Sequence, residues 1–351
     1  MPEKVQSVDE STTNTGSDPV FEVRDLSVYF DMDRGQSRVI DEVSIDIDRE
    51  EIIGIVGESG SGKSMFASAL LDAVVSPGKV TGDITYNPPE GESVDVLDQS
   101  SSALRRFRWE EVAMVFQGAI SSFNPTMTFR GHFEETLEYH GYDMEEGMEH
   151  ARDLIETLHL DPDRTLDSYP HELSGGMKQR MLIALSLVLD PEVLVMDEPT
   201  AALDLLMQRS ILSLIHDLKE EYGLTVVFIT HDLPLIASLA DRLAVLYAFE
   251  FIEVGPAQEV KTNAKHPYMR SLLRAVPSID SPIEDMRPIQ GATPDPVNVP
   301  AGCSYNPRCP LASEKCRMQD PPLEEIKAGH QVSCFHWEDS ADELPLMEGD
   351  E

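Results

Sequence analysis

Basic side chains are scarce in this chain of 351 residues, where 27 Lys and Arg stand against 64 Asp and Glu and leave a formal net charge of -37. Proteins that bind nucleic acids neutralise phosphates with Lys and Arg, so this imbalance argues against nucleic-acid binding. The stretch 338–351 is acidic, but its seven carboxylates cannot supply the whole excess. An acidic surface repels itself in dilute buffer, whereas molar salt shortens the Debye length to about 3 Å and screens the repulsion. The composition therefore predicts a salt-loving, halophilic host.

Long hydrophobic runs are missing as well. The longest, at 181–189, is about half of the roughly 20 apolar residues that a membrane-spanning helix needs. The segment 1–18 lacks the apolar stretch of a secretory signal and favours a short disordered lead. The hydrophobic content of 41% is nevertheless enough for a proper core. We therefore expect a cytoplasmic protein that does not itself cross a membrane.

The region 20–260 has the rhythm of an α/β domain. Short apolar runs alternate there with amphipathic helical patterns, which is typical of a largely parallel sheet covered by helices. The stretch at about 119–190 turns helical and predicts a helical subdomain inserted between two halves of the sheet. Each predicted strand is short and apolar enough to be covered on both faces. These strands lie at 52–56, 193–196 and 225–229.

Beyond residue 260 the pattern changes. Proline becomes frequent and regular periodicity fades, which predicts a small irregular C-terminal region at 261–337. The acidic tail at 338–351 follows it.

A glycine-rich loop follows the first predicted strand. Residues 57–64, GESGSGKS, fit the phosphate-loop pattern G-x-x-x-x-G-K-[ST] and precede a helical stretch. The glycines let backbone N–H groups turn toward phosphates, Lys63 supplies a positive charge, and the Ser64 hydroxyl can ligate Mg²⁺. The residues expected to bind ATP are Gly57, Glu58, Ser59, Gly60, Ser61, Gly62, Lys63 and Ser64.

Two carboxylates end a later strand, where the apolar run VLVM leads into Asp197 and Glu198. Beside a phosphate loop, such a pair can place Asp197 on Mg²⁺ and Glu198 where it polarises an attacking water. We therefore predict that Asp197 binds the metal and that Glu198 is the general base.

A third motif opens a helix. In LSGGMKQR, at 173–180, Ser174, Gly175 and Gly176 precede an apolar helix face. Backbone donors and the positive end of the helix dipole favour an anion site at this point. Such a site cannot easily reach the phosphate loop of its own chain, which indicates a second subunit. The expected apolar face consists of Met177, Met181, Leu185 and Val188.

Together these motifs resemble those of ABC transporter ATPases. GESGSGKS resembles the Walker A loop, VLVMDE the Walker B strand, and LSGGMKQR the ABC signature. The resemblance implies a Q-loop glutamine at Gln117, which takes part in Mg²⁺ and ATP binding and in catalysis, and a catalytic switch histidine at His231. It also implies a D-loop at 202–204. The aromatic residue that stacks on adenine corresponds best to Phe30, with Tyr29 as the rival.

The resemblance extends past the ABC core to oligopeptide/dipeptide permease ATPases of the D type. SSFNPTMTF, YPHELSGGM, YAFEFIEVGPAQEV, KHPYMRSLLRAVPS and GCSYNPRCPLASEKC carry it, so that it covers most of the chain from Phe21 to His336. Two departures stand out: 118–119 reads Gly-Ala in place of Asp-Pro, and 205–207 reads Leu-Leu-Met in place of Val-Thr-Val. The fold implied is a phosphate-loop ABC nucleotide-binding domain with a mostly parallel sheet core, an antiparallel β part and the inserted helices.

The resemblance also implies partners and a location. ATP hydrolysis would power peptide import at the cytoplasmic face of the cell membrane. The partners would be a sister ABC ATPase in a heterodimer, two transmembrane permease subunits and an extracellular lipid-anchored substrate-binding protein, and no nucleic acid. Related archaeal importers take up sugars or nickel, so the cargo stays open. A soluble ABC ATPase acting on nucleic acid or ribosomes and an electron-transfer module are the rival functions.

Only four cysteines occur, all in the C-terminal region, with spacing C-x5-C-x6-C-x17-C. Disulfides are disfavoured in a reducing cytosol, and structural zinc usually brings a tight C-x2-C pair that is missing here. Four thiolates could hold a [4Fe-4S] cluster, because cluster ligation asks for sulfur more than for a fixed spacing. Members of the permease family carry such a cluster in the matching tail, and zinc or plain buried thiols are the alternatives. The cysteines are Cys303, Cys309, Cys316 and Cys334.

Overall fold

The computed structural model describes residues 19–118, 122–201, 203–275 and 289–346. The predicted disordered lead at 1–18 lies outside the described residues, as do Ala119, Ala202 and part of the proline-rich linker. In the described ranges, no helix is both long and apolar enough to span a membrane.

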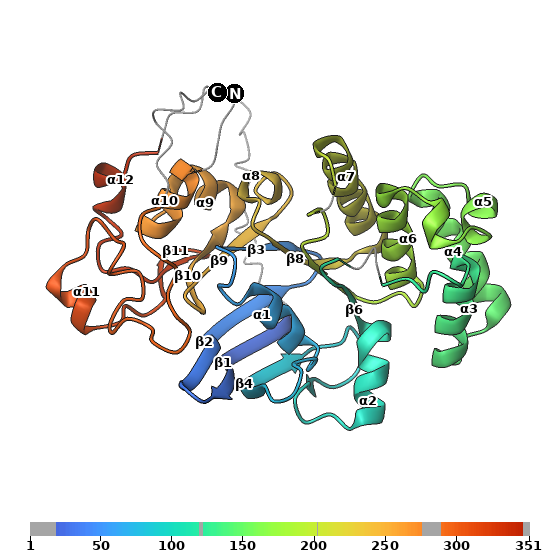
Figure 1. Cartoon of the computed structure of the whole chain (residues 1–351), viewed down its shortest axis with the longest axis horizontal. Coiled ribbons are helices and arrows are strands. Elements are labelled where there is room, and N and C mark those ends of the chain that lie inside the picture. Colours follow the sequence, from blue (N-terminus) through green and yellow to red (C-terminus); the bar gives the residue numbers. More distant parts are fainter. Residues whose placement is uncertain (1–18, 119–121, 202, 276–288, 347–351) are drawn as a thin grey trace, which may run out of the picture.

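Two sheets form the body of the protein (Figure 1). The smaller sheet is antiparallel, with strand order β2-β1-β4-β5. The larger has the order β11-β12-β10-β9-β3-β8-β7-β6, and the five strands from β9 to β6 are parallel. The α/β expectation and the three predicted strands are therefore confirmed. The strands are β1 Pro19–Met32, β2 Gly35–Asp48, β3 Ile52–Val56, β4 Lys79–Tyr86, β5 Val94–Asp95, β6 Val112–Val115, β7 Val193–Asp197, β8 Thr225–Thr230, β9 Arg242–Tyr247, β10 Glu250–Pro256, β11 Glu324–Lys327 and β12 His330–Val332.

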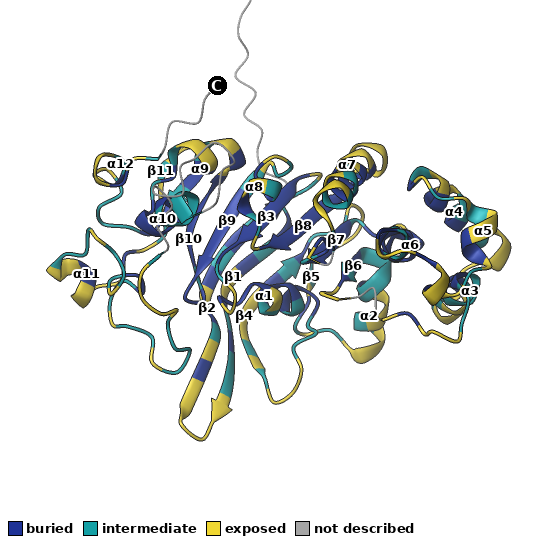
Figure 2. Ribbon diagram, turned by 45° about the horizontal axis from the view of Figure 1, so that its top comes forward, coloured by how far each residue is buried: buried dark blue, intermediate teal, exposed yellow. Residues whose placement is uncertain are grey.

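The interiors of the parallel strands are apolar, because both faces of these strands are covered. Ile52 and Val56 of β3 belong to one hydrophobic cluster, whereas Ile53 and Ile55 belong to the other. This division follows from the alternation of side chains along a strand. Figure 2 shows the central strands as buried and the far end of the β1–β2 hairpin as exposed.

Helices cover these faces. Among them, α1 follows β3, and α3 to α6 form a group beyond β6 (Figure 1). That group lies within the range predicted for the inserted helical subdomain, although the domain limits themselves stay predictions. The helices are α1 Lys63–Leu70, α2 Ser101–Arg106, α3 Phe129–His140, α4 Met144–Thr157, α5 Pro162–Leu166, α6 Gly175–Leu187, α7 Leu205–Tyr222, α8 Leu233–Ile236, α9 Ala257–Asn263, α10 Pro267–Ala275, α11 Glu314–Met318 and α12 Ser340–Glu343, with a kinked turn at Phe107–Glu111 and a 3-10 turn at Pro170–Glu172.

The helix α6 differs from its predicted one-sided pattern. Besides Met181 and Leu185 on the expected face, Ile183 and Leu187 are also buried. The helix is therefore enclosed on most sides, as expected for a helix at the centre of the inserted group.

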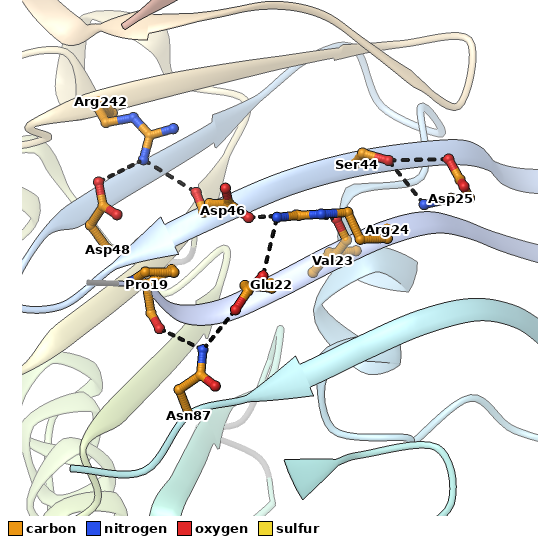
Figure 3. A network of polar contacts seen from close by, with 10 residues as sticks. All are labelled: Pro19, Glu22, Val23, Arg24, Asp25, Ser44, Asp46, Asp48, Asn87 and Arg242. Carbon is orange, nitrogen blue, oxygen red and sulfur yellow. Dashed lines mark hydrogen bonds and ion pairs between the residues drawn. The ribbon is translucent and has the colours of Figure 1, made fainter. Parts of the chain in front are cut away.

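A polar network ties the two sheets together (Figure 3). Arg242 of β9 donates to the backbone oxygen of Asp46 and forms ion pairs with Asp48 and Glu51. Asp46 also pairs with Arg24 of β1, at 2.5 Å. These contacts hold the antiparallel sheet against the larger sheet, near the start of β3.

The C-terminal region is only partly irregular, so that expectation was too simple. Its strands β12 and β11 join β10 and extend the main sheet. They have only three and four residues, too few to show an alternating pattern in the sequence. Part of the acidic tail is docked, because Arg270 of α10 donates to the backbone oxygen of Leu344 at 2.6 Å.

Candidate nucleotide-binding site

Four parallel neighbours carry the predicted site on their carboxyl ends. The loop 57–64 follows β3, His231 follows β8, Asp197 and Glu198 end β7, and Gln117 comes two residues after β6. Carboxyl ends of parallel strands share one edge of the sheet, and ligands bind along that edge in open α/β folds. Sequence segments more than 170 residues apart therefore form one site.

The phosphate loop turns sharply into α1. Gly62 caps this helix with φ 110°, and a Cβ atom there would lie 2.2 Å from the backbone oxygen of Val39. Only glycine fits such a position. The side chain of Lys63 is buried, and its Nζ donates to the backbone oxygens of Gly57 and Glu58 at 2.9 Å. Burial lowers the pKa of Lys63, although the charges of Glu198 and Asp197 oppose this shift.

Asp197 fits a metal ligand. Its side chain is buried, and its Oδ1 has no hydrogen-bond partner. Burial raises the pKa of Asp197, and a hydrogen bond from Ser64 opposes the shift. A buried carboxylate oxygen without a partner is costly unless a cation or donor satisfies it. Asp197 and Ser64 would therefore bind Mg²⁺. The bound ion would neutralise negative charge on the phosphates.

Glu198 and His231 face each other. Glu198 Oε1 lies 2.7 Å from His231 Nδ1, and Glu198 adopts φ 49°, the left-handed region that few side chains favour. The backbone N–H of Glu198 donates to the backbone oxygen of Ile229 on β8, which fixes this turn. Strained backbone of this kind clusters at functional sites. The side chain of Glu198 is 10% exposed, whereas that of His231 is 65% exposed.

The two candidate aromatic residues lie on opposite sides of β1. Phe30 packs on the hydrophobic cluster that includes α1 residues, close to Gly78. Tyr29 instead lines a polar groove with Arg38 and lies under the Lys79 ammonium, 5.7 Å from the ring centre. Phe30 therefore lies on the side of β1 that faces α1, the helix that follows the phosphate loop.

The signature residues lie apart from the phosphate loop. Ser174 is the N-cap of α6 and its hydroxyl accepts from the backbone N–H of Met177. Both Figure 1 and Figure 2 show α6 among the inserted helices, away from α1. Ser174 and Gly175 are exposed, whereas Gly176 lies directly on Met207 of α7, where a Cβ would come 1.8 Å from Met207 Cε. The described structure therefore brings Gln117, Asp197, Glu198 and His231 to the phosphate-loop edge but not Ser174.

Two residues of the C-terminal region contact the phosphate loop, which the sequence analysis did not predict. Tyr268 of α10 accepts from the backbone N–H of Glu58, and Arg308 pairs with the Glu58 carboxylate. These two residues lie in the segments KHPY and NPRCP. In the sequence these segments indicate only the resemblance to the family, and nothing in them predicts a contact with the phosphate loop.

The four cysteines line one small cavity, together with His266 and Tyr305. All four thiols are free. Burial raises the pKa of Cys303 and Cys334 to about 12 and that of Cys309 to about 11. Among the described residues, no three His, Cys, Asp or Glu side chains are arranged to hold a single metal ion. The four thiols share this cavity, but their arrangement gives no support of its own to a bound metal ion.

The fold and this site define an ABC ATPase cassette. The structure is similar to the dimeric ABC transporter cassette MJ0796, with 26% identity, a TM-score of 0.59, and coverage of 68% of this chain and 98% of that one. It shares the fold of CbiO1 from Clostridium perfringens, part of the transporter complex CbiONQ, with a TM-score of 0.60, 22% identity, and coverage of 72% of this chain and 95% of that one. The family described as "ABC transporter" matches residues 40–201.

The particular family follows from the rest of the chain. The family described as "Oligopeptide/dipeptide transporter, C-terminal region" matches residues 252–316. The dipeptide transport ATP-binding protein DppD of Caldanaerobacter subterraneus is 37% identical over 91% of this chain and 98% of its own length. The oligopeptide transport ATP-binding protein OppD of Escherichia coli is 37% identical over 91% and 94%. The chain belongs to this family of ATP-binding subunits of ABC transporters.

Proposed function

We propose that this chain binds and hydrolyses ATP to power the import of dipeptides or oligopeptides. The observation that carries the proposal is the Glu198–His231 pair beside Asp197 at the edge that holds the phosphate loop. The cargo is inferred from the relatives, which are named as dipeptide and oligopeptide transport proteins.

The positions of the residues support a proposed role for each of them. Lys63 would exchange its bonds to loop oxygens for bonds to phosphate oxygens, while Ser64 and Asp197 bind Mg²⁺. Glu198 would accept the proton of the attacking water, and His231 would orient its carboxylate. Gln117 would reach the metal and the γ-phosphate from the end of β6. Phe30 is the better candidate for stacking on adenine, because it lies on the α1 side of β1.

A second cassette would complete the site. Ser174 and Gly175 are exposed at the start of α6, away from the phosphate loop of the same chain, and Gly176 follows them beneath Met207. A partner's nucleotide would bind at this helix start. The similar cassette MJ0796 is described as dimeric, including a state bound to ADP and Pi. The partner would be a sister ATPase, with two permease subunits and a lipid-anchored binding protein, at the cytoplasmic face of the membrane.

The Glu198→Gln variant tests this function in the assembled transporter. It keeps the size of the side chain but removes the base, so ATP still binds while turnover falls about 10²-fold or more. Glu221→Gln, at an exposed position near the end of α7, is the matched control. Near-normal hydrolysis by Glu198→Gln would show that Glu198 is not the general base. A wild-type protein that binds no ATP would refute the proposed function.

The cysteine cavity is proposed to hold a [4Fe-4S] cluster, supported by four free thiols that line one cavity. The protein purified without oxygen would then contain about four irons and four sulfides and absorb visible light. Stoichiometric zinc without iron supports the zinc alternative, and a protein without either metal supports plain thiols.

The net charge of -37 supports a halophilic host, with an archaeon as the source. Self-repulsion at this charge is screened only at high ionic strength, so the melting temperature should rise steeply between dilute buffer and molar KCl. Equal melting temperatures in the two buffers would contradict it.

A further inference from the structure

Glu58, in the phosphate loop, is contacted from two sides by residues that lie far away in the sequence. Its backbone N–H donates to the Tyr268 hydroxyl at 3.1 Å. Its carboxylate accepts two hydrogen bonds from Arg308, at 2.9 and 3.0 Å. The two partners belong to α10 and to the cysteine-containing segment, so the C-terminal region contacts both the backbone and the side chain of this one loop residue.

The Arg308 side chain is itself fixed. It is 6% exposed, its Nε donates to the backbone oxygen of Gln290, and its guanidinium lies 5.7 Å from the ring centre of Tyr247. A paired fork of two parallel hydrogen bonds to a carboxylate is both strong and directional. The position of Glu58 is therefore set by a rigid partner, unlike that of a residue in an exposed ion pair.

The position of Glu58 in turn affects the loop around it. Its backbone oxygen accepts from the backbone N–H of Ser61 at 3.2 Å, which closes a turn within the loop. It also accepts from Lys63 Nζ at 2.9 Å, a bond that Lys63 would give up when it binds phosphate. The loop also contains glycines with positive φ, such as Gly60 with φ 82°, whose backbone has more freedom than that of other residues. A loop that is ordered before the ligand arrives loses less entropy on binding.

We propose that Arg308 is a positioning residue for nucleotide binding, and that it acts through Glu58 to hold the phosphate loop in its binding conformation. The proposal rests on the function proposed above, since it assumes that the loop binds ATP. It assigns the C-terminal region a part in the nucleotide site of its own chain.

The Arg308–Glu58 pair is not needed to hold the C-terminal region on the rest of the protein. Tyr247, Tyr268 and Tyr305 form a buried aromatic cluster with ring centres 4.5 to 5.5 Å apart, which already joins the sheet, α10 and the cysteine segment. Such rings contribute through their buried area and their edge-to-face contacts. Loss of the Arg308–Glu58 pair should therefore leave the region docked and change the loop.

A double-mutant cycle on the full chain tests the proposal, with Mg-ATP binding measured by titration of a fluorescent ATP analogue. Arg308→Met should weaken binding about tenfold, a typical coupling for contacting charged residues. Glu58→Gln should weaken it by a similar factor, and the double variant should bind no more weakly than either single variant. In the assembled ATPase the KM for ATP should rise while kcat changes little, because Arg308 touches no reacting group.

Controls separate the possible failures. Arg317→Gln removes an exposed arginine of the same region and should bind ATP like the wild type. Should Arg308→Met not fold, Glu58→Gln still tests the pair, because Arg308 retains its bond to Gln290. Wild-type affinity in folded Arg308→Met, or losses that multiply in the double variant, would overturn the proposal while leaving the function intact. A wild-type chain that binds no ATP would instead refute the function.

Discussion

Glu198 Oε1 lies 2.7 Å from His231 Nδ1, although the two residues are 33 positions apart in the chain. They meet because β7 and β8 are parallel neighbours, with Asp197 paired to Ile229. The left-handed backbone at Glu198 then turns its carboxylate toward the end of β8. A carboxylate and an imidazole at this distance can share a proton and orient each other.

Replacing His231 by Ala should lower ATP turnover about 10²-fold, the usual scale for a group that assists proton transfer, while ATP binding persists. Steady-state hydrolysis by the assembled transporter and ATP binding by the chain measure the two effects. His216→Ala, at an exposed position on α7, should hydrolyse ATP at the wild-type rate. Equal losses of binding and turnover in His231→Ala would argue against an orienting role.

Replacing Asp197 by Asn should abolish the tightening of ATP binding by Mg²⁺. The wild-type Oδ1 is buried without a partner, and an amide is a much weaker magnesium ligand than a carboxylate. ATP titrations with Mg²⁺ and with excess EDTA measure this, and removal of the metal should weaken binding of the wild type alone. A variant that responds to Mg²⁺ as the wild type does would show that Asp197 is not the ligand.

Replacing Ser174 by Arg should affect only the function of the pair of cassettes. Ser174 is exposed, so the variant should fold and bind ATP, although loss of the α6 N-cap costs about 1 kcal/mol of stability. The assembled ATPase should lose at least about tenfold in rate, because the partner's phosphates lose their donors. Ser102→Arg, at an exposed position on α2, is the control. Full activity of Ser174→Arg would exclude a nucleotide clasped between two chains.

Glu250 should make stability depend on pH. Burial raises its pKa to about 8, and Asp320 and Asp41 add to the shift, whereas Arg38 opposes it. The unfolded chain releases this proton near the ordinary value of 4.5, but the folded chain retains it, so this group's contribution to stability falls as pH rises from about 4.5 to about 8.

Glu250→Gln should therefore be more stable than the wild type at pH 9, by about 1 kcal/mol, and should lose less stability between pH 5 and pH 9. Thermal denaturation at both pH values measures the difference. Glu92→Gln, at an exposed position, should follow the wild type. If Glu250→Gln loses as much stability as the wild type between pH 5 and pH 9, other groups are responsible for the pH dependence.

The local motifs were predictable because each depends on neighbours in the chain. The phosphate loop after β3, the carboxylates at the end of β7 and the N-cap at Ser174 all follow from residue types at fixed spacing. Short apolar runs also predicted three of the parallel strands, β3, β7 and β8, because a strand covered on both faces reads as a nearly continuous apolar run.

The contacts that complete the site were not predictable in this way. Arg308 and Glu58 are 250 residues apart, and the short strands β11 and β12 carry no pattern that links them to β10. The sequence by itself determined which chemistry this protein carries, since a phosphate loop and an acidic pair are local arrangements. Only the tertiary structure decided which distant side chains hold that loop in place, because packing brings them together without any signal in their spacing.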